Sequence, residues 1–166
     1  MKKLAILFLI MVSFAAGAAR AQVPEDIQKH RTCKYCDMDR LHYAHSRMLV
    51  EYSDGTSFGS CSLHCTAVDL ALNIGKTPIS IMAGDYNTGE LINAEAAFWV
   101  IGGDRPGVMT RRAKWAFGKK RDADEFVRIH GGRASSFDEA LKASYEDMYL
   151  DSRMIRDRRK IRKMIR

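Results

Sequence analysis

The chain has 166 residues, a net charge of +7, 46% hydrophobic residues, 3 prolines and 12 glycines. This composition excludes collagen-like, low-complexity and wholly disordered chains, and the length suits one domain or two very small ones. The positive charge lies at the two ends. Residues 152–166 carry eight basic residues against one acid, and residues 1–21 add three basic residues, which leaves the body between them at −3.

Residues 1–21 have the features of a secretory signal peptide. Lys2 and Lys3 precede an apolar run, and the sequence ARA at residues 19–21 fits the small-x-small cleavage rule. The run is short for a membrane-spanning helix. We therefore expect export to the periplasm or cell envelope, where nucleic acid is not a partner. The first cysteine is Cys33, so we do not expect a lipoprotein.

The pattern that follows predicts an α+β fold built from small β-hairpin and helix units. A hairpin turn at residues 53–55 joins two strands, because glycine accepts the positive φ that such a turn needs. Ser136 with Glu139 three residues later forms a capping box that begins a C-terminal helix. The expected strands are 48–52, 56–60, 79–83, 97–101 and 113–117, and the expected helices are 63–72, 122–130 and 136–150.

Four segments follow from this pattern. They are a signal peptide at 1–21, an N-terminal cysteine-rich ββα unit at 22–76, a C-terminal α/β unit at 77–151 and a basic amphipathic tail at 152–166. The strands and helices of both halves also allow two similar α/β halves. The tail is expected to be helical, with its apolar residues on one side. Such a helix predicts peripheral contact with an anionic membrane, or docking to an acidic partner.

All four cysteines lie between residues 33 and 65 in two pairs, Cys33 with Cys36 and Cys61 with Cys65. The predicted hairpin joins the two pairs and would bring them together. Cys61 and Cys65 are also i, i+4 neighbours, so both face one site if the helix begins early enough. Met38 and His64 lie close by in the sequence and enlarge the set of candidate ligands.

Several interpretations of these cysteines are open. An exported chain with an even cysteine count favours disulfides, although a bridge within Cys-x-x-Cys closes a loop too short to contribute much. Four thiolates fit structural Zn(II), whereas thiolates combined with a thioether favour Cu(I). A thiol oxidoreductase is disfavoured because no strand precedes Cys33, and no catalytic motif indicates an enzyme. Met109, after a glycine-rich turn, is by residue type a gap-filling side chain.

Several runs of the chain together carry a recognisable pattern. They are Cys33-Lys-Tyr-Cys36-Asp-Met38-Asp-Arg40, His45-Ser-Arg-Met48, Cys61-Ser-Leu-His64-Cys65, Trp99-Val-Ile-Gly-Gly103, Gly107-Val-Met109-Thr, Lys114-Trp-Ala-Phe117, Asp122-Ala-Asp-Glu-Phe126 and His130-Gly-Gly132. This combination resembles the NosL family, accessory proteins of nitrous oxide reductase, over most of the chain between residues 33 and 143.

The resemblance implies a non-enzymatic Cu(I)-binding metallochaperone of the cell envelope. Its fold would be two small α/β units, and its partner a copper-accepting envelope enzyme, with nitrous oxide reductase suspected. The family's Cys-x-x-Cys-x-Met element falls on Cys33, Cys36 and Met38, and its methionine after the glycine-rich turn falls on Met109. Asp37 stands where glycine is common in the family.

We therefore expect a Cu(I) site, with Zn(II) as the alternative metal. The expected ligands are four cysteines with three auxiliary side chains, namely Cys33, Cys36, Cys61 and Cys65 with Met38, His64 and Met109. The alternative function is a periplasmic structural or interaction module stabilised by zinc or by disulfides.

Overall fold

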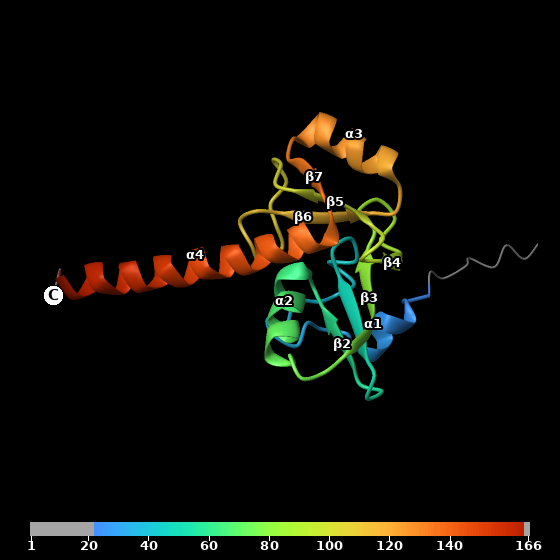
Figure 1. The fold of residues 1–166 in the computed structure, drawn as a ribbon, viewed down its shortest axis with the longest axis horizontal. Helices are drawn as coiled ribbons and strands as arrows, with labels where there is room; N and C mark the ends of the chain where they lie inside the picture. The colour runs from blue at the N-terminus through green and yellow to red at the C-terminus, as the bar shows by residue number, and fades with distance from the viewer. Residues whose placement is uncertain (1–21, 165–166) are drawn as a thin grey trace, which may run out of the picture.

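The structure is a computed structural model that describes the backbone of residues 22–164 and the side chains of residues 22–157. The predicted signal peptide at 1–21 lies outside the described residues. Within them, mixed helices and antiparallel sheets confirm the predicted α+β class (Figure 1).

The first sheet has four antiparallel strands in the order β2-β1-β3-β4. They are β1 (Met48–Tyr52), β2 (Ser57–Ser60), β3 (Pro78–Gly84) and β4 (Leu91–Asn93). The turn between β1 and β2 is the predicted hairpin turn, with Gly55 at a φ of 80°. A short helix α1 (Glu25–Lys29) precedes this sheet, and α2 (Leu63–Leu72) follows β2.

The second sheet has three antiparallel strands in the order β6-β5-β7. They are β5 (Phe98–Ile101), β6 (Lys114–Phe117) and β7 (Arg133–Ser135), with α3 (Lys120–His130) between β6 and β7. Helix α4 (Phe137–Met164) follows and begins at the predicted capping box. The Glu139 N–H donates to Ser136 Oγ at 3.3 Å, and the Ser136 N–H donates to Glu139 Oε2 at 3.0 Å.

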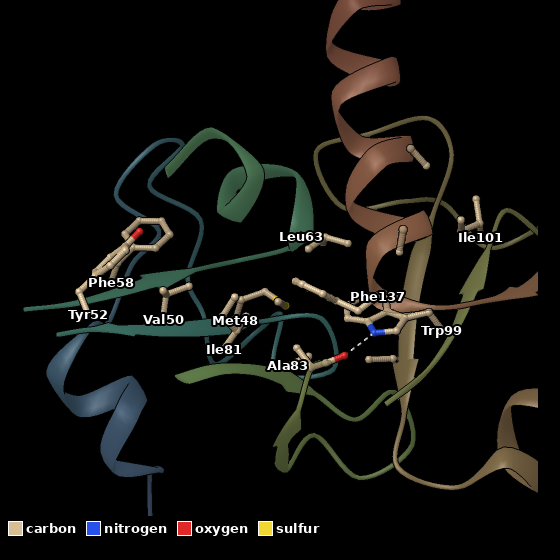
Figure 2. Packing of buried hydrophobic residues seen from close by; sticks show 14 residues of the cluster. Met48, Val50, Tyr52, Phe58, Leu63, Ile81, Ala83, Trp99, Ile101 and Phe137 are labelled. Atoms are coloured by element: carbon tan, nitrogen blue, oxygen red, sulfur yellow. Dashed lines mark hydrogen bonds between the residues drawn. The ribbon is translucent and has the colours of Figure 1, made fainter. Parts of the chain in front are cut away.

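The two sheets are joined through a shared apolar core. Met48 and Ile81 of the first sheet belong to the same buried cluster as Trp99 and Phe137, which come from the second half of the chain (Figure 2). The Trp99 indole donates to the carbonyl of Ala94 at 2.8 Å, which satisfies the one polar atom of this large side chain. A parallel bridge between Asp85 and Ala116 adds a backbone link between the sheets.

Some boundaries differ from the sequence-based expectations. The sheet that holds β1 and β2 also includes β3 and β4, so it continues past residue 76, because the second edge of β1 pairs with β3. The short elements α1, β4 and β7 were not expected. The division of the chain into domains stays a prediction.

Helix α4 is longer than expected and continues from the predicted end near Leu150 through the basic tail to Met164. Its C-terminal half extends beyond the body of the molecule (Figure 1). Basic residues near a helix C-terminus interact favourably with the helix dipole, which is consistent with this extension. No helix in the described part of the chain has both the length and the apolarity to cross a bilayer.

Candidate metal centre

The first pair of cysteines lies on a tight turn between α1 and β1, residues 33–38, which we call the cysteine turn. The Cys33 N–H donates to the carbonyl of Met38 at 2.9 Å, and the Asp37 N–H donates to the carbonyl of Cys33 at 2.9 Å. Asp37 has a φ of 56°, in the left-handed region that favours glycine and that aspartate tolerates better than most residues. This backbone conformation explains why glycine suits the position.

The second pair lies where β2 leads into α2. Cys61 directly follows β2, and Cys65 lies in the first turn of α2, which begins at Leu63. The Sγ atoms of all four cysteines lie within 4.8 Å of one another. The Sγ separations are 3.4 Å for Cys36–Cys61, 3.8 Å for Cys61–Cys65 and 4.0 Å for Cys65–Cys36. The hairpin therefore brings the two pairs together, as the sequence predicted.

The four thiols differ in their access to solvent. Cys33, Cys61 and Cys65 are at most 1% exposed, whereas Cys36 is partly exposed. The three buried cysteines belong to an apolar cluster formed largely by the second half of the chain, with Val100, Val108, Ala113, Trp115, Phe117, Ala123 and Phe126. One side of the four-cysteine cluster is thus sealed by the second sheet, and Cys36 marks its open side.

The thiols also differ in their acidity. Hydrogen bonds from the Cys61 and Cys65 thiols hold the pKa of Cys33 far below its ordinary value, and the backbone N–H groups of Tyr35 and Cys61 add to this. The same hydrogen bonds to Cys33, together with burial, raise the pKa of Cys61 and of Cys65. Without a metal, these shifts favour a thiolate at Cys33 and protonated thiols at Cys61 and Cys65.

The arrangement suits a soft metal ion. All four cysteines are free thiols, and their sulfur separations far exceed the roughly 2.05 Å of a disulfide bond. Four thiolates at about 2.3 Å from a tetrahedral Zn²⁺ would lie about 3.8 Å apart, close to the separations seen here. Thiolates are equally ligands that select Cu(I). In the described part of the chain, no second cluster of histidine, cysteine or acidic side chains has a comparable arrangement.

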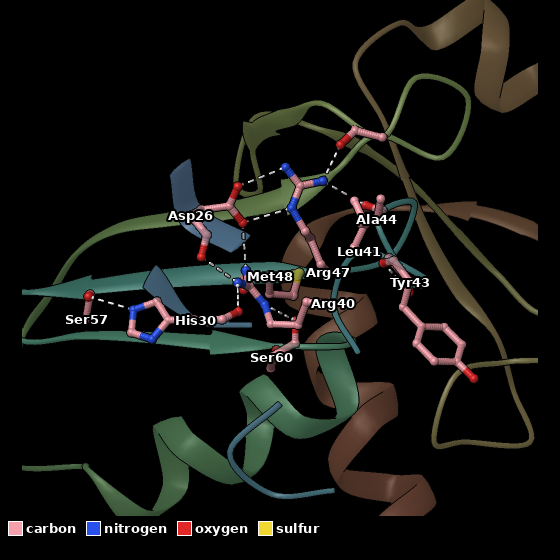
Figure 3. Close-up of polar contacts among 12 residues, drawn as sticks. Asp26, His30, Arg40, Leu41, Tyr43, Ala44, Arg47, Met48, Ser57 and Ser60 are labelled. Carbon is pink, nitrogen blue, oxygen red and sulfur yellow. Dashed lines mark hydrogen bonds and ion pairs between the residues drawn. The ribbon is translucent and has the colours of Figure 1, made fainter. Parts of the chain in front are cut away.

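A buried arginine supports the cysteine turn. The Arg40 guanidinium donates to the carbonyls of Ser60 at 3.1 Å and Met48 at 2.9 Å, and to Asp26 Oδ2 at 2.8 Å (Figure 3). Arg47 donates to the same carboxylate at 2.8 Å. Burial raises the pKa of Asp26, but the two guanidiniums outweigh burial and hold it below 3.8. Since Ser60 precedes Cys61, Arg40 connects the cysteine turn to the strand that delivers the second pair.

A second acid supports the loop that carries Met109, residues 107–112, which we call the methionine loop. Asp147 of α4 accepts hydrogen bonds from Thr110 Oγ1 and Arg112 Nε, both at 3.0 Å, and from the buried Lys114 Nζ. Burial raises the pKa of Asp147, but Lys114 and Arg112 outweigh burial and lower it. Met109 has a φ of 59°, so this loop also contains a non-glycine residue in the left-handed region.

The three predicted auxiliary ligands lie in different surroundings. Met38 packs against the apolar cluster that contains the buried cysteines. The His64 Nδ1 atom is buried without a hydrogen-bond partner in the described structure, in a small pocket that Thr110 and Lys114 also line. Burial, and then the charge of Lys114, lowers the pKa of His64. Met109 is 39% exposed. His64 does not belong to the four-cysteine cluster, and the metal-binding roles of these three residues stay predictions.

Sequence reasoning identified the four cysteines but missed the residues that hold them in place. Arg40 and Asp26 were not singled out, because nothing in the local sequence shows that an arginine is buried against the next strand. Asp69, a buried acid of α2, was also missed. The sequence held one signal for it, because Asp69 lies four residues after Cys65 and therefore on the same face of the helix.

Comparisons with known proteins agree with this fold. A sequence model of the NosL family matches residues 24–145 of the chain. The crystal structure of the copper chaperone NosL from Shewanella denitrificans is similar in fold, with a TM-score of 0.55 and 22% sequence identity over 71% of this chain and 94% of that chain. No curated protein sequence matches the chain.

Proposed function

The chain belongs to the NosL family, and on that premise we propose that it is a copper-binding chaperone that carries Cu(I) as its cargo on the four-cysteine cluster. The observation that supports this most directly is the approach of four Sγ atoms to within 4.8 Å of one another. Thiolates select Cu(I) over harder ions. Under this proposal the protein is not an enzyme, because it passes on a metal ion and changes no covalent bond of a substrate.

The four thiols have different proposed roles in metal binding, because they differ in burial and in pKa. Cys33 offers the first thiolate, since the pKa of its thiol is lowered by its neighbours. Binding of Cu(I) then displaces protons from Cys61 and Cys65, so affinity should rise with pH. Cys36 is the partly exposed thiol. A soft ligand of an acceptor can approach the metal beside Cys36 while the buried thiols still hold it. Met38, His64 and Met109 are proposed as auxiliary ligands.

The proposal also covers the compartment of the protein, the recipient of its copper and its contact with lipid. The signal-like residues 1–21 support export to the periplasm or cell envelope. The proposed recipient is a copper-accepting enzyme of that compartment, and the resemblance to the family points to nitrous oxide reductase. The basic tail supports peripheral contact with anionic lipid. Deleting residues 152–166 should lower co-sedimentation with phosphatidylglycerol vesicles in low salt, and unchanged binding would discard the lipid contact.

One observation also favours a second candidate, a structural Zn(II) site. The Sγ separations of 3.4, 3.8 and 4.0 Å are close to those of a closed tetrahedral site. A structural zinc contributes directly to folding, so its removal should unfold or strongly destabilise the protein. A cargo site leaves the metal-free protein folded, and metal analysis of anaerobically purified protein would separate the two candidates.

The decisive test is titration of the reduced protein with Cu(I) in competition with a chromogenic chelator, without oxygen. We expect one tightly bound ion, and a large loss of affinity in the C33S/C36S and C61S/C65S double variants. The M109L variant, with M82L on β3 as its matched control, tests the auxiliary role of Met109. Unchanged affinity in C33S/C36S would refute the cluster as the copper site.

A further inference from the structure

Helix α2 carries a buried acid on the same face as Cys65. Asp69 lies four residues after Cys65, one helical turn further along α2, and is 1% exposed. Its carboxylate is not a member of the four-cysteine cluster. A buried carboxylate is costly unless hydrogen bonds satisfy it, so the partners of Asp69 indicate what it does.

Both oxygens of Asp69 accept hydrogen bonds from tyrosines. Tyr35 Oη donates to Oδ1 at 2.9 Å, and Tyr52 Oη donates to Oδ2 at 2.5 Å. The two tyrosines differ in their place in the chain. Tyr52 ends β1, away from any cysteine in the sequence, whereas Tyr35 lies between Cys33 and Cys36 on the cysteine turn.

Tyr35 is held at both of its ends. Its backbone lies on the cysteine turn, which the hydrogen bond from the Cys33 N–H to the carbonyl of Met38 closes at 2.9 Å. Its ring packs against Phe58 of β2, with the ring centroids 5.5 Å apart, and the Lys34 ammonium lies 5.6 Å from the centroid of the Tyr35 ring. The side chain therefore runs from the cysteine turn to the carboxylate on the helix that carries Cys65.

We propose that Asp69, acting through Tyr35, is a positioning residue that sets the separation of the two cysteine pairs for metal binding. The inference rests on the proposed function, since it concerns the same four-cysteine cluster. Partners that orient metal ligands from outside the coordination sphere change metal affinity by about 10- to 100-fold when they are removed. Tyr52 donates to the other oxygen of the same carboxylate and lies on β1, outside the cysteine turn in the chain, so it provides the matched control.

The test compares the Y35F and Y52F variants of the full chain. Each loses one hydroxyl and one hydrogen bond to Asp69 and keeps its aromatic ring. Cu(I) and Zn(II) affinities are measured by chelator competition at a temperature where both variants are folded, with thermal stability measured in parallel. We expect Y35F to lose at least about tenfold in affinity and Y52F to stay within about threefold of the wild type. The intensity of the thiolate-to-copper absorption should also fall in Y35F alone.

A second pair of variants keeps the test decisive if Y35F folds poorly. D69N retains a carbonyl acceptor for Tyr35 and should keep most of the affinity, whereas D69L removes the acceptor and should lose it. Equal affinities in Y35F and Y52F, or in D69N and D69L, would overturn the positioning role while leaving the chaperone proposal standing. A wild-type chain that binds neither metal would overturn the proposed function, and this inference with it.

Discussion

The cysteine turn and the methionine loop are each fixed to a helix by a buried acid, but the hydrogen-bond donors to that acid differ. Each holds a non-glycine residue in the left-handed region, Asp37 at a φ of 56° and Met109 at 59°. Each is tied to a helix by a buried acid. Asp69 of α2 accepts from the neutral hydroxyls of Tyr35 and Tyr52, whereas Asp147 of α4 accepts from the cations Lys114 and Arg112 and from Thr110 Oγ1.

The difference predicts how each region responds to change. Burial together with Asp69 raises the pKa of Tyr35 to about 12, so this hydroxyl stays a neutral donor over the physiological range. The hydrogen bond from Tyr35 to Asp69 can therefore be removed without leaving a buried cation that lacks a partner. The Asp147 side chain, in contrast, neutralises a lysine side chain that is only 1% exposed, so removing this acid leaves a buried charge behind.

The largest effect is expected at the support of the cysteine turn. In D26A, the guanidiniums of Arg40 and Arg47 stay buried and lose their shared carboxylate. Breaking a buried ion pair from one side costs about 3–5 kcal/mol, and we expect a loss at the upper end because two cations are affected. Urea denaturation of the reduced protein measures it. A loss below about 1 kcal/mol would show that these guanidiniums find water instead.

The next largest effect should fall on the methionine loop. D147A leaves Lys114 buried without its partner and should destabilise the fold by about 3 kcal/mol in the same assay. Replacing both partners with apolar residues, as in K114M/D147L, should restore most of that stability. If the double variant is as unstable as D147A, the loop depends on the hydrogen bonds of Asp147 and not on the neutralisation of Lys114.

An acid titration should show a smaller effect at the methionine loop. The pKa of Asp147 in the folded protein is held below its ordinary value of 3.8, because Lys114 and Arg112 outweigh burial. Its contribution to stability is therefore complete above pH 3.8 and is lost as the pH falls below that value. Each such carboxylate adds a slope of at most about 1.4 kcal/mol per pH unit. Denaturation between pH 5 and 2.5 should show a shallower slope in D147N than in the wild type, and an equal slope would contradict this contribution.

The smallest effects concern the two left-handed residues. D37G and M109G relieve backbone strain but increase the entropy of the unfolded chain, so each should change stability by less than about 1 kcal/mol. M109A should be less stable than M109G, since alanine cannot adopt this φ without strain. Thermal melts of the two pairs, D37G with D37A and M109G with M109A, measure the difference. An alanine variant as stable as its glycine counterpart would show that the loop relaxes to another conformation.

Local sequence signals predicted most of the fold. The bounds of β1 and α2 agree with the expected 48–52 and 63–72, and the capping box at Ser136 forms as expected. These features depend on residues close together in the chain. By contrast, β7 was not expected because Arg133–Ser135 has neither β-branched nor aromatic residues and is a strand only through its pairing with β5.

In the candidate site too, the features that depend on residues close together in the chain were predictable. The cysteine pairs stand out because their spacing is local, and the hairpin between them is a strong turn signal. The link from Tyr35 to Asp69 spans 34 residues, and the one from Lys114 to Asp147 spans 33, so both depend on the tertiary fold. Asp37 was noted only as a departure from glycine, and its left-handed conformation needed the structure.

The long final helix also sets a geometric scale for the molecule. From Asp147, the acid of α4 that contacts the methionine loop, to Met164 the helix advances 17 residues, which at about 1.5 Å per residue gives a rod of about 26 Å. The length of this rod helps to set the distance between Cys36 and any surface or partner that binds at its tip. Shortening the rod by whole turns of about 5.4 Å would tune that spacing while preserving the face that the tip presents.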